Sequence, residues 1–263
     1  MPLNWIDTTN LSFNALLLLE QAQISWMPGN VPEAELDIAL QANPAVDWFL
    51  RHKHPAIIPW LEQIHSSHPS AHQPKEDDIR QAELQVLSAI NDWLVYALDP
   101  SIYDAQPFMG WDSNELRNMA DFNGKTVLDI GSGTGRLALV AAEQAGVVFA
   151  VEPVGNLRRY IQGKAQAQGF GNVYTIDGVI TAIPFPDGFA DITMTGHVYG
   201  DQPEAEYLEM KRVTKPGGMV LLCPGTSLNE IAAHEYLLSQ DFHWAEFEEP
   251  TEGMKRKYWK TKE

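Results

Sequence analysis

The feature that most constrains this fold is a short apolar run that leads directly into a glycine-rich turn. Residues 127–130 read Val-Leu-Asp-Ile, and Gly131, Gly133 and Gly135 follow at alternate positions. Such a run suits a strand that is buried in a parallel sheet. Residues 136–144 then read as a helix of strong helix formers. Because glycine permits positive φ and a close approach of the backbone, the turn can hold a ligand against the free N–H groups of the helix start.

The spacing of these glycines separates two classes of nucleotide-binding turn. A dinucleotide-binding turn has the pattern Gly-x-Gly-x-x-Gly, with a pyrophosphate at the start of the helix. Here the pattern is Gly-x-Gly-x-Gly, which disfavours an NAD-dependent dehydrogenase. It resembles the first motif of the class I S-adenosylmethionine (SAM)-dependent methyltransferases. The resemblance implies that SAM is the cofactor, that S-adenosylhomocysteine is its product, and that the binding residues include Asp129, Gly131, Ser132, Gly133 and Gly135.

A second apolar run, over residues 147–151, ends at Glu152 and Pro153. A carboxylate at the end of a parallel strand has two oxygens that can accept hydrogen bonds from the vicinal hydroxyls of a ribose. We therefore predict that Glu152, with Pro153 beside it, binds the ribose of the cofactor. A role of Glu152 as a cap of the following helix stays open beside this one.

A third strand, over residues 172–176, ends at Asp177 and Gly178. In the family that the glycine motif resembles, an acid at this point accepts a hydrogen bond from the adenine amino group, and the segment that follows flanks the ring. The resemblance therefore assigns Asp177 and Gly178 to the adenine, with residues 180–186 beside them. Many family members carry the corresponding Leu-Pro-Phe-like segment closer to the acid than residues 183–185 stand here.

Further strands complete an α/β pattern. A turn at residues 186–188 precedes a fourth strand over 189–195, and Lys-Pro-Gly-Gly at 215–218 precedes a fifth over 219–223. The remaining predicted elements are a helix around 229–240 and a hairpin formed by 242–247 and 256–260. We expect an α/β fold with a doubly wound, mostly parallel sheet and its ligand at the carboxyl ends of the strands. The resemblance implies seven strands with a reversed last strand.

The loop after the fourth strand contains the residues that we predict to act in methyl transfer. Transfer from a sulfonium depends mainly on proximity, orientation and removal of water, and a base is needed only for a protonated acceptor. Because histidine titrates near neutral pH, we predict that His197 is the base or orients the acceptor, with Tyr199 and Asp201 in support. A purely structural role for His197 stays open.

Residues 1–115 have helix-like patterns, and we predict a helical cap that forms the substrate region, ahead of a SAM-binding domain over 116–263. The predicted helices cover 14–26, 32–42, 45–51, 56–65 and 77–98, with a polar linker at 66–75. Tyr103, Phe108 and Trp111 stand between these two parts. They could cover the sulfonium, since a cation is attracted to an aromatic face within about 6 Å. Simple packing of the two parts against each other is the alternative role.

The charge balance narrows the class of partner. The chain has 35 acidic and 18 basic residues, a formal net charge of −17, which argues against an extended nucleic-acid surface. The basic clusters at 158–164 and 255–257 are predicted to lie on solvated faces. No apolar run approaches the roughly 18 residues of a membrane span, and the first residues carry no secretory signal pattern. We therefore expect a cytoplasmic protein.

Cysteine and histidine usage predicts no metal site. Cys223 is the one cysteine of the chain, so an internal disulfide and a thiolate metal cluster are excluded. Histidines gather between His52 and His72, but they have no acidic or thiolate partner at ligand spacing. We interpret this region as a solvated loop.

These patterns predict SAM-dependent methyl transfer to a small-molecule acceptor, at an oxygen, nitrogen or carbon atom. The alternative within the same chemistry is a protein or RNA methyltransferase. A different class of function also stays open, namely a SAM-binding sensor or partner subunit that transfers no methyl group. A sensor would need no open path from the loop around His197 to the methyl group.

Overall fold

The structure is a computed structural model that describes residues 5–68 and 74–263. The chain divides into two compact units, Met1–Tyr103 and Asp104–Glu263. Residues 104–115, which we assigned to the helical cap from the sequence, lie in the second unit. Within the linker predicted at 66–75, residues 69–73, with His72 among them, lie outside the described residues.

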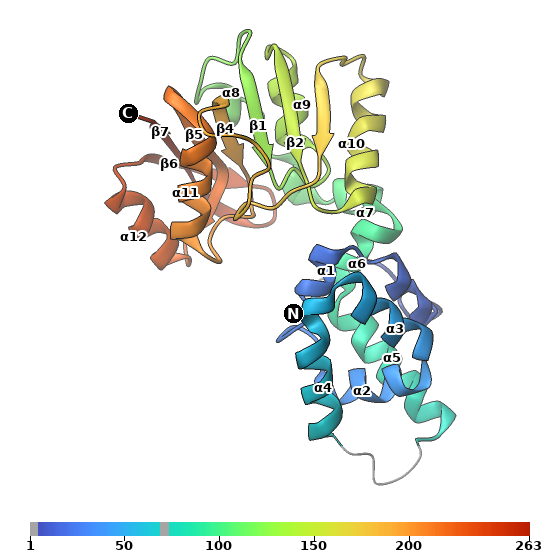
Figure 1. Ribbon diagram of the computed structural model, residues 1–263. Coiled ribbons are helices and arrows are strands. Elements are labelled where there is room, and N and C mark those ends of the chain that lie inside the picture. The colour runs from blue at the N-terminus through green and yellow to red at the C-terminus, as the bar shows by residue number, and fades with distance from the viewer. Residues whose placement is uncertain (1–4, 69–73) are drawn as a thin grey trace. The chain divides into compact units, whose positions relative to one another are not determined.

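The second unit is built on a mixed sheet with the strand order β3-β2-β1-β4-β5-β7-β6 (Figure 1). Its strands are β1 (Thr126–Ile130), β2 (Val147–Val151), β3 (Val173–Ile176), β4 (Ala190–Thr195), β5 (Thr214–Ser227), β6 (His243–Glu249) and β7 (Gly253–Thr261). The first five strands are parallel, and β7 is antiparallel to both β5 and β6. The predicted doubly wound sheet with a reversed last strand is confirmed. Because β6 runs in the same direction as the first five strands, its carboxyl end lies at the same edge of the sheet as theirs.

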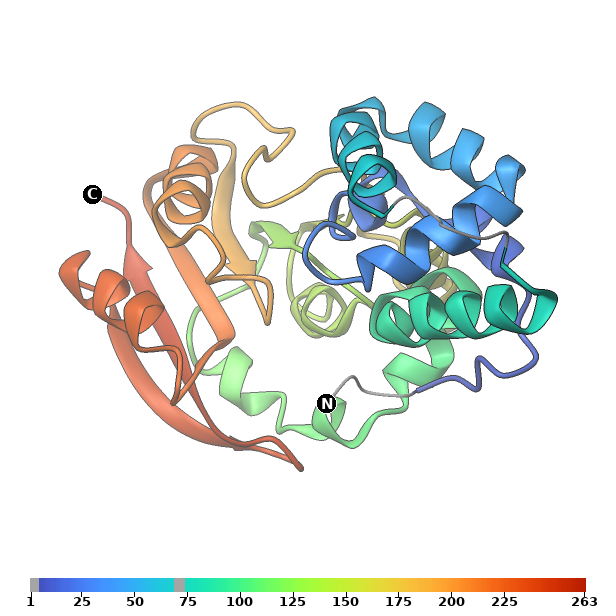
Figure 2. The same cartoon turned by 90° about the horizontal axis from the view of Figure 1, so that it is seen from below.

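Helices cover both faces of this sheet. They are α8 (Asn114–Arg117), α9 (Arg136–Ala142), α10 (Gly155–Ala167), α11 (Pro203–Val213) and α12 (Ile231–Ser239), with a short 3-10 helix η3 (Pro107–Gly110) ahead of them. Figure 2 shows α8 and α9 on one face of the sheet and α11 on the other. The buried side chains of α8 and α9 belong to one apolar core, and those of α11 and α12 belong to another. Burial on both faces explains why the central strands read as continuous apolar runs.

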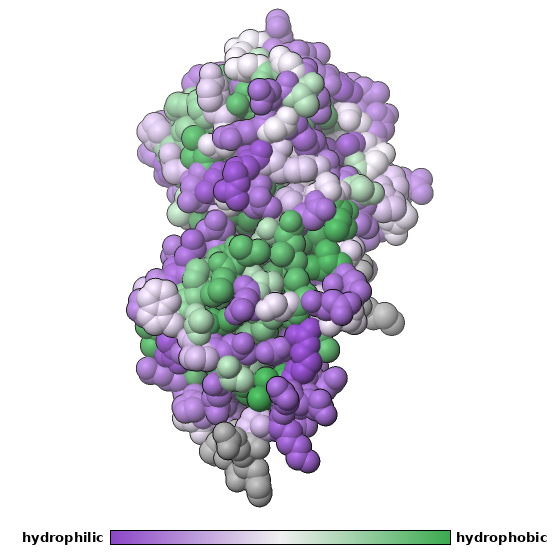
Figure 3. All heavy atoms as spheres, turned by 90° about the vertical axis from the view of Figure 1, so that its right-hand side faces the viewer, coloured by the Kyte–Doolittle hydropathy of each residue, from purple (hydrophilic) through white to green (hydrophobic). Residues whose placement is uncertain are grey.

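The first unit is a helical bundle with its own apolar core. Its elements are η1 (Phe13–Leu18), α1 (Gln21–Ser25), α2 (Glu33–Ala42), α3 (Pro44–Lys53), η2 (Pro55–Ile57), α4 (Ile58–Ser67), α5 (Glu76–Ala89) and α6 (Asn91–Leu98), and α7 (Pro100–Asp104) leads out of it. Figure 3 shows apolar side chains gathered on one face of this unit. The exposed apolar side chains of the unit include Leu17, Leu18, Trp26 and Trp48.

The single helix predicted over 77–98 is wrong in one respect, because α5 and α6 are separate helices that meet at Ile90. The buried Asn91 side chain follows the break and binds the start of the chain. Its Oδ1 accepts hydrogen bonds from the N–H groups of Trp5 and Ile6 at 2.8 and 3.2 Å, and its Nδ2 donates to the Ile6 carbonyl at 2.8 Å. The apolar periodicity continues through the break, so the pattern alone gave no sign of it.

In the parts of the chain that the structure describes, 5–68 and 74–263, no helix has the length and apolar character needed to cross a membrane.

Candidate functional site

The glycine-rich turn between β1 and α9 has the backbone that its sequence predicts. Gly131, Gly133 and Gly135 all have positive φ, at 67°, 54° and 84°. Asp129, at the end of β1, is buried, and its Oδ2 accepts a hydrogen bond from the Ala138 N–H of α9 at 3.0 Å. This bond holds the first turn of α9 against β1. Asp129 therefore supports the turn by a contact within the protein interior. Burial raises the pKa of its carboxyl to about 7.

Glu152 follows β2 and joins it to the glycine-rich turn. Its Oε2 accepts a hydrogen bond from the Gly133 N–H at 3.0 Å, and its Oε1 accepts one from the Val154 N–H at 2.9 Å. The side chain is buried, which raises the pKa of its carboxyl to about 7. A carboxylate has about four acceptor positions, so each oxygen keeps one for a further donor. Two free acceptor positions beside a glycine-rich turn match the needs of two vicinal hydroxyls.

The turn itself contains features that accommodate a ligand. A Cβ added at Gly133 would meet no atom within 4 Å, so open space lies beside this part of the turn. Ser132 uses its hydroxyl internally, donating to the Asp129 carbonyl at 2.8 Å. The Thr134 hydroxyl is buried and has no hydrogen-bond partner among residues 5–68 and 74–263. This unpaired polar group and the open space at Gly133 fit a polar group bound at the turn.

The raised pKa of Glu152 predicts a pH effect on the stability of the ligand-free protein. The folded protein holds the proton on this carboxyl more tightly than the unfolded chain, so the stabilisation is complete below about pH 4.5 and is lost as pH rises through about 7. We expect Glu152→Gln, which carries no ionisable proton, to be less sensitive to pH across that interval. The difference in the free energy of unfolding should be of the order of 1.4 kcal/mol for each unit by which the pKa is raised.

Urea unfolding of wild type and Glu152→Gln at pH 5 and pH 8 measures this difference. Glu235→Gln, in the exposed part of α12, is the matched control and should keep the pH dependence of wild type. Equal pH dependence in wild type and Glu152→Gln would contradict the prediction.

The two residues assigned to the adenine lie at the start of the segment between β3 and β4. The Asp177 side chain is 73% exposed and forms an ion pair with Arg158 at 3.2 Å. Gly178 approaches its neighbours closely, since an added Cβ would lie 2.7 Å from Pro184 and 2.9 Å from Val151. Only glycine fits this position without a shift of the neighbours. The close approach brings the segment of residues 180–186 onto the end of β2.

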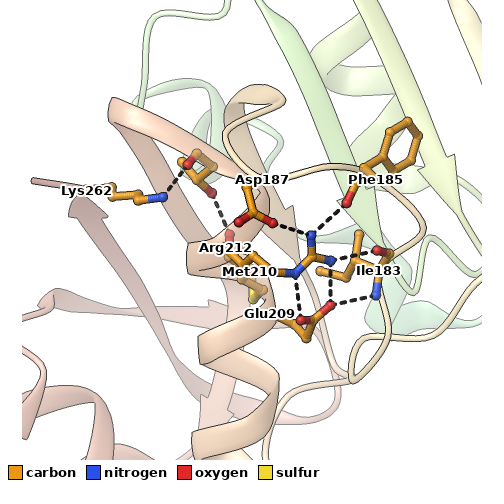
Figure 4. A network of polar contacts seen from close by, with 8 residues as sticks. Ile183, Phe185, Asp187, Glu209, Met210, Arg212 and Lys262 are labelled. Carbon is orange, nitrogen blue, oxygen red and sulfur yellow. Dashed lines mark hydrogen bonds and ion pairs between the residues drawn. The ribbon is translucent and has the colours of Figure 1, made fainter.

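Arg212 of α11 fixes the other end of this segment (Figure 4). Its guanidinium donates to the carbonyls of Ile183 and Phe185 at 2.9 and 2.8 Å. It also forms ion pairs with Asp187 at 3.0 Å and Glu209 at 2.8 Å. Hydrogen bonds to these two carboxylates raise the pKa of Arg212, which therefore stays charged. Five hydrogen-bonding N–H groups in one rigid plane make arginine the residue suited to such a multiple attachment.

Removal of this attachment should loosen the segment of residues 180–186. We expect Arg212→Met to lower the free energy of unfolding by about 1–3 kcal/mol, because the carbonyls of Ile183 and Phe185 lose the guanidinium as a donor, and the Glu209 carboxylate keeps only the Ile183 N–H. SAM affinity should fall with it, and urea unfolding and calorimetry measure the two effects. Lys211→Met, at the adjacent exposed position, is the control. Stability and affinity equal to those of Lys211→Met would remove Arg212 from this role.

The loop after β4 brings His197 to the carboxyl edge of the sheet. Its backbone is left-handed, with φ of 63°, a conformation that few residues other than glycine adopt and that often occurs at functional sites. The next residue, Val198, packs on the glycine-rich turn, because a Cβ added at Gly131 would lie 2.6 Å from its side chain. The loop of His197 therefore lies directly beside the turn.

A cavity of about 140 Å³ borders this loop. It is lined by His197, Tyr199, Pro224, Gly225, Thr226, Ser227, Glu230 and Lys255. These residues come from the loop after β4, the carboxyl end of β5, the position before α12 and the start of β7. The pairing of β5 with β7 shifts register between Leu222 and Thr226, next to this cavity. The cavity thus occupies the edge of the sheet at which we predicted the ligand.

Glu249 is the partner of His197 that the sequence did not reveal. It ends β6, is 0% exposed, and its Oε1 lies 2.8 Å from His197 Nε2. Its Oε2 lies 3.4 Å from the Lys255 ammonium. The prediction that the basic cluster at 255–257 is solvated is wrong, because Lys255 pairs with Glu249 and Lys257 pairs with Glu115 at 2.6 Å. In the sequence, only the opposite charges of the acidic residues near the end of β6 and the basic residues of β7 indicated such pairs.

The other predicted residues are placed as follows. The Tyr199 hydroxyl donates to the Pro203 carbonyl at 3.1 Å, and burial raises the pKa of this phenol. Asp201 is exposed. Trp111 is 3% exposed and packs on Phe247, with the Arg136 guanidinium 4.4 Å from its ring centroid. Pro153 is half-buried beside Glu152.

Tyr103 belongs to the first unit, where its ring contacts those of Trp5 and Tyr96 at 5.1 and 5.0 Å. Phe108, in η3, brings its ring to 6.1 Å from the His197 imidazole in an edge-to-face arrangement. The structure therefore brings together the glycine-rich turn, Glu152 and His197 within the second unit. The roles of all these residues toward a ligand stay predictions.

Comparison with known proteins identifies related chains. Residues 128–222 match the family model described as a methyltransferase domain. A demethylmenaquinone methyltransferase of Geobacillus kaustophilus is 32% identical over 163 residues, 59% of this chain and 66% of that protein. An uncharacterized methyltransferase of Mycobacterium marinum is 36% identical over 118 residues, 44% of this chain and 45% of that protein. The chain thus spans between about half and two thirds of the length of these relatives.

A solved structure with the same fold is a chain from the complex between the Trm112 methyltransferase activator and a methyltransferase of Haloferax volcanii. The TM-score is 0.50 and the sequence identity is 16%, over 66% of this chain and 96% of that one. At this identity the likeness concerns the fold alone.

Proposed function

We propose that this chain, whose second unit belongs to the class I SAM-dependent methyltransferases, transfers a methyl group from SAM to a small-molecule acceptor. The sulfonium of bound SAM supplies an electrophilic methyl group. The chain itself has to hold the donor and the acceptor in line, exclude water, and accept a proton from the acceptor where there is one.

One observation carries this proposal: the buried Glu152 carboxylate is hydrogen-bonded to Gly133 within the glycine-rich turn and keeps an acceptor position on each oxygen. In the proposed complex, Glu152 accepts from the ribose hydroxyls, the turn binds the methionine part, and the segment of residues 180–186 flanks the adenine. His197, beside the same turn, faces the acceptor.

Two observations support a small acceptor that is chemically changed. The 140 Å³ cavity borders His197, which favours an enzyme over a sensor, because a sensor needs no such space beside the methyl group. Two of the related proteins are named demethylmenaquinone methyltransferase, a name that specifies a small-molecule acceptor. A cavity of about 150 Å³ can hold benzene, so the volume of this cavity is sufficient for about one aromatic ring.

Calorimetric titration of the purified protein with SAM, S-adenosylhomocysteine and NAD tests the proposal at its first step. We expect micromolar binding of the two adenosyl ligands and no binding of NAD. Transfer of radioactive methyl from SAM to a panel of small phenols, enols and amines then tests the second step. Failure of both adenosyl ligands to bind would overturn the proposed function.

A further inference from the structure

We infer that His197 and Glu249 form a proton-accepting pair that selects acceptors with a weakly acidic hydroxyl, such as a phenol or an enol, and that Glu249 is its positioning residue. This inference rests on the proposed function and deepens it. The sequence predicted His197 alone as a base. The inference adds that the Glu249 carboxylate acts through His197, and it adds the class of acceptor that the pair requires.

The first step of the argument is the contact between the two side chains. His197 Nε2 lies 2.8 Å from Glu249 Oε1, and the carboxylate is 0% exposed while the imidazole is 34% exposed. One partner is thus closed to water, and the other lines the cavity. The Nε2–Oε1 distance is within hydrogen-bonding range, and neither Glu249 oxygen accepts a hydrogen bond from another of the described residues.

The second step concerns the charge of Glu249. A buried carboxylate is strongly disfavoured unless cations compensate it. Lys255 lies 3.4 Å from Oε2 and supplies one positive charge. A proton that arrives on His197 places a second positive charge 2.8 Å from Oε1. Glu249 therefore stabilises the imidazolium and, before that, favours the tautomer with its proton on Nε2 and its basic lone pair on Nδ1.

The third step is the chemistry that such a pair performs. The hydroxyl proton of the acceptor passes to Nδ1 of His197, and the imidazolium formed is held by Glu249. The bond from sulfur to the methyl carbon breaks as the methyl group bonds to the acceptor oxygen, or to a carbon made nucleophilic by loss of that proton. S-adenosylhomocysteine leaves with the electron pair of the broken bond. A neutral amine already carries a nucleophilic lone pair and needs no proton removed before attack.

The fourth step is the position of the pair in the fold. His197 is held in a left-handed backbone conformation by a loop that packs on the glycine-rich turn. Glu249 arrives from β6, which runs parallel to β1–β5 because β7 lies between β5 and β6. The two residues are 52 positions apart in the chain, and only this topology brings them to one edge of the sheet.

The first experiment reads the imidazole directly and needs no acceptor. Two-bond ¹H–¹⁵N correlation spectra of the full chain with labelled histidine and bound S-adenosylhomocysteine report which ring nitrogen carries the proton. His197→Asn identifies the signal. We expect the proton on Nε2 of His197 in wild type and a shift of population toward Nδ1 in Glu249→Gln.

A matched control separates this effect from the loss of an ion pair. Glu115→Gln also removes a glutamate that is paired with a lysine of β7, at 2.6 Å from Lys257, without a contact to His197. It should leave the His197 signal as in wild type. A His197 proton on Nδ1 in wild type, or the same signal in wild type and Glu249→Gln, would overturn the inference.

The second experiment measures methyl transfer to resorcinol and to m-phenylenediamine, which have the same shape but carry hydroxyls and amines respectively. We expect wild type to methylate resorcinol at least tenfold faster. Glu249→Gln should lower kcat with resorcinol by about 10²-fold, the lower range for general base catalysis, while the Kd for SAM changes less than twofold. Glu249→Asp, which keeps the charge, should recover part of kcat, and Glu115→Gln should retain all of it.

The outcomes distinguish the two proposals. A wild type that binds neither SAM nor S-adenosylhomocysteine overturns the proposed function. A wild type that binds both and methylates the diamine as fast as resorcinol overturns the selection of hydroxyl acceptors. A kcat in Glu249→Gln within threefold of wild type overturns the role of Glu249. If neither probe is methylated, the tautomer of His197 in wild type and Glu249→Gln decides on the pair by itself.

Discussion

His197→Asn is expected to lower kcat for methyl transfer by about 10²–10⁴-fold, the range that a positioned general base contributes. Asparagine is the appropriate replacement because it tolerates the left-handed backbone that His197 adopts at φ of 63°. It cannot accept a proton, so the acceptor would have to lose its proton to water. Steady-state kinetics with a hydroxyl acceptor measures kcat, and calorimetry measures the Kd for SAM, which should change less than about threefold.

The control for this variant is His243→Asn. His243 is exposed and begins β6, at the edge of the sheet opposite to Glu249. Its replacement should leave both kcat and the Kd for SAM as in wild type. An unchanged kcat in His197→Asn, with a competent hydroxyl acceptor, would make His197 a structural residue and would leave proximity and orientation as the whole of the catalysis.

Glu152→Ala is expected to weaken SAM binding by about 1–3 kcal/mol, the scale of a lost hydrogen-bond acceptor for buried donors. The ribose hydroxyls would lose their partner. The Gly133 and Val154 N–H groups would lose theirs as well, so the turn itself should become less ordered. Calorimetric titration with S-adenosylhomocysteine measures the affinity without turnover.

Two further variants make this prediction specific. Glu152→Gln keeps the shape and one acceptor oxygen and should fall between wild type and Glu152→Ala. Glu235→Ala, at an exposed position of α12, should bind as wild type does. Circular dichroism establishes that each variant is folded. An affinity of folded Glu152→Ala equal to that of wild type would exclude Glu152 from the ribose site.

The parallel part of the sheet could be predicted because its signals are local. The first two strands read as buried apolar runs, and the first three strands end at recognisable residues, namely Gly131, Glu152 and Asp177. The glycine spacing then specified the turn, and all three glycines have positive φ. Elements of this kind are specified within about 15 residues of chain, which is the range over which periodicity and turn chemistry act.

The partner of His197 could not be predicted in the same way. Tyr199 and Asp201 were proposed as its support because they are close in sequence, yet the Tyr199 hydroxyl binds Pro203 and Asp201 is exposed. Glu249 is remote in sequence and adjacent in space, since the contact depends on β7 lying between β5 and β6. A single sequence carries no local signal for a pairing of that kind.

The break between α5 and α6 was missed for a related reason. Asn91 is satisfied by the backbone of Trp5 and Ile6, more than 80 residues earlier in the chain. The helical pattern over 77–98 gives no sign that Asn91 binds the backbone of Trp5 and Ile6. Periodicity reports only on neighbouring positions, so it carries no information on hydrogen bonds between residues this far apart in the chain.

The residues predicted to bind SAM and the carboxylate that contacts His197 belong to different parts of the sheet. Most of the residues predicted to bind the donor, Asp129 to Gly178, lie at the ends of β1, β2 and β3, which are neighbours in the sheet. Glu249 instead lies on a strand that joins the sheet only through β7, which is made after it. The position of Glu249 beside His197 therefore depends on the pairing of β7 with both of its neighbours. A change that weakens the pairing of β7 with β5 or β6 would therefore be expected to separate Glu249 from His197, although it alters neither residue.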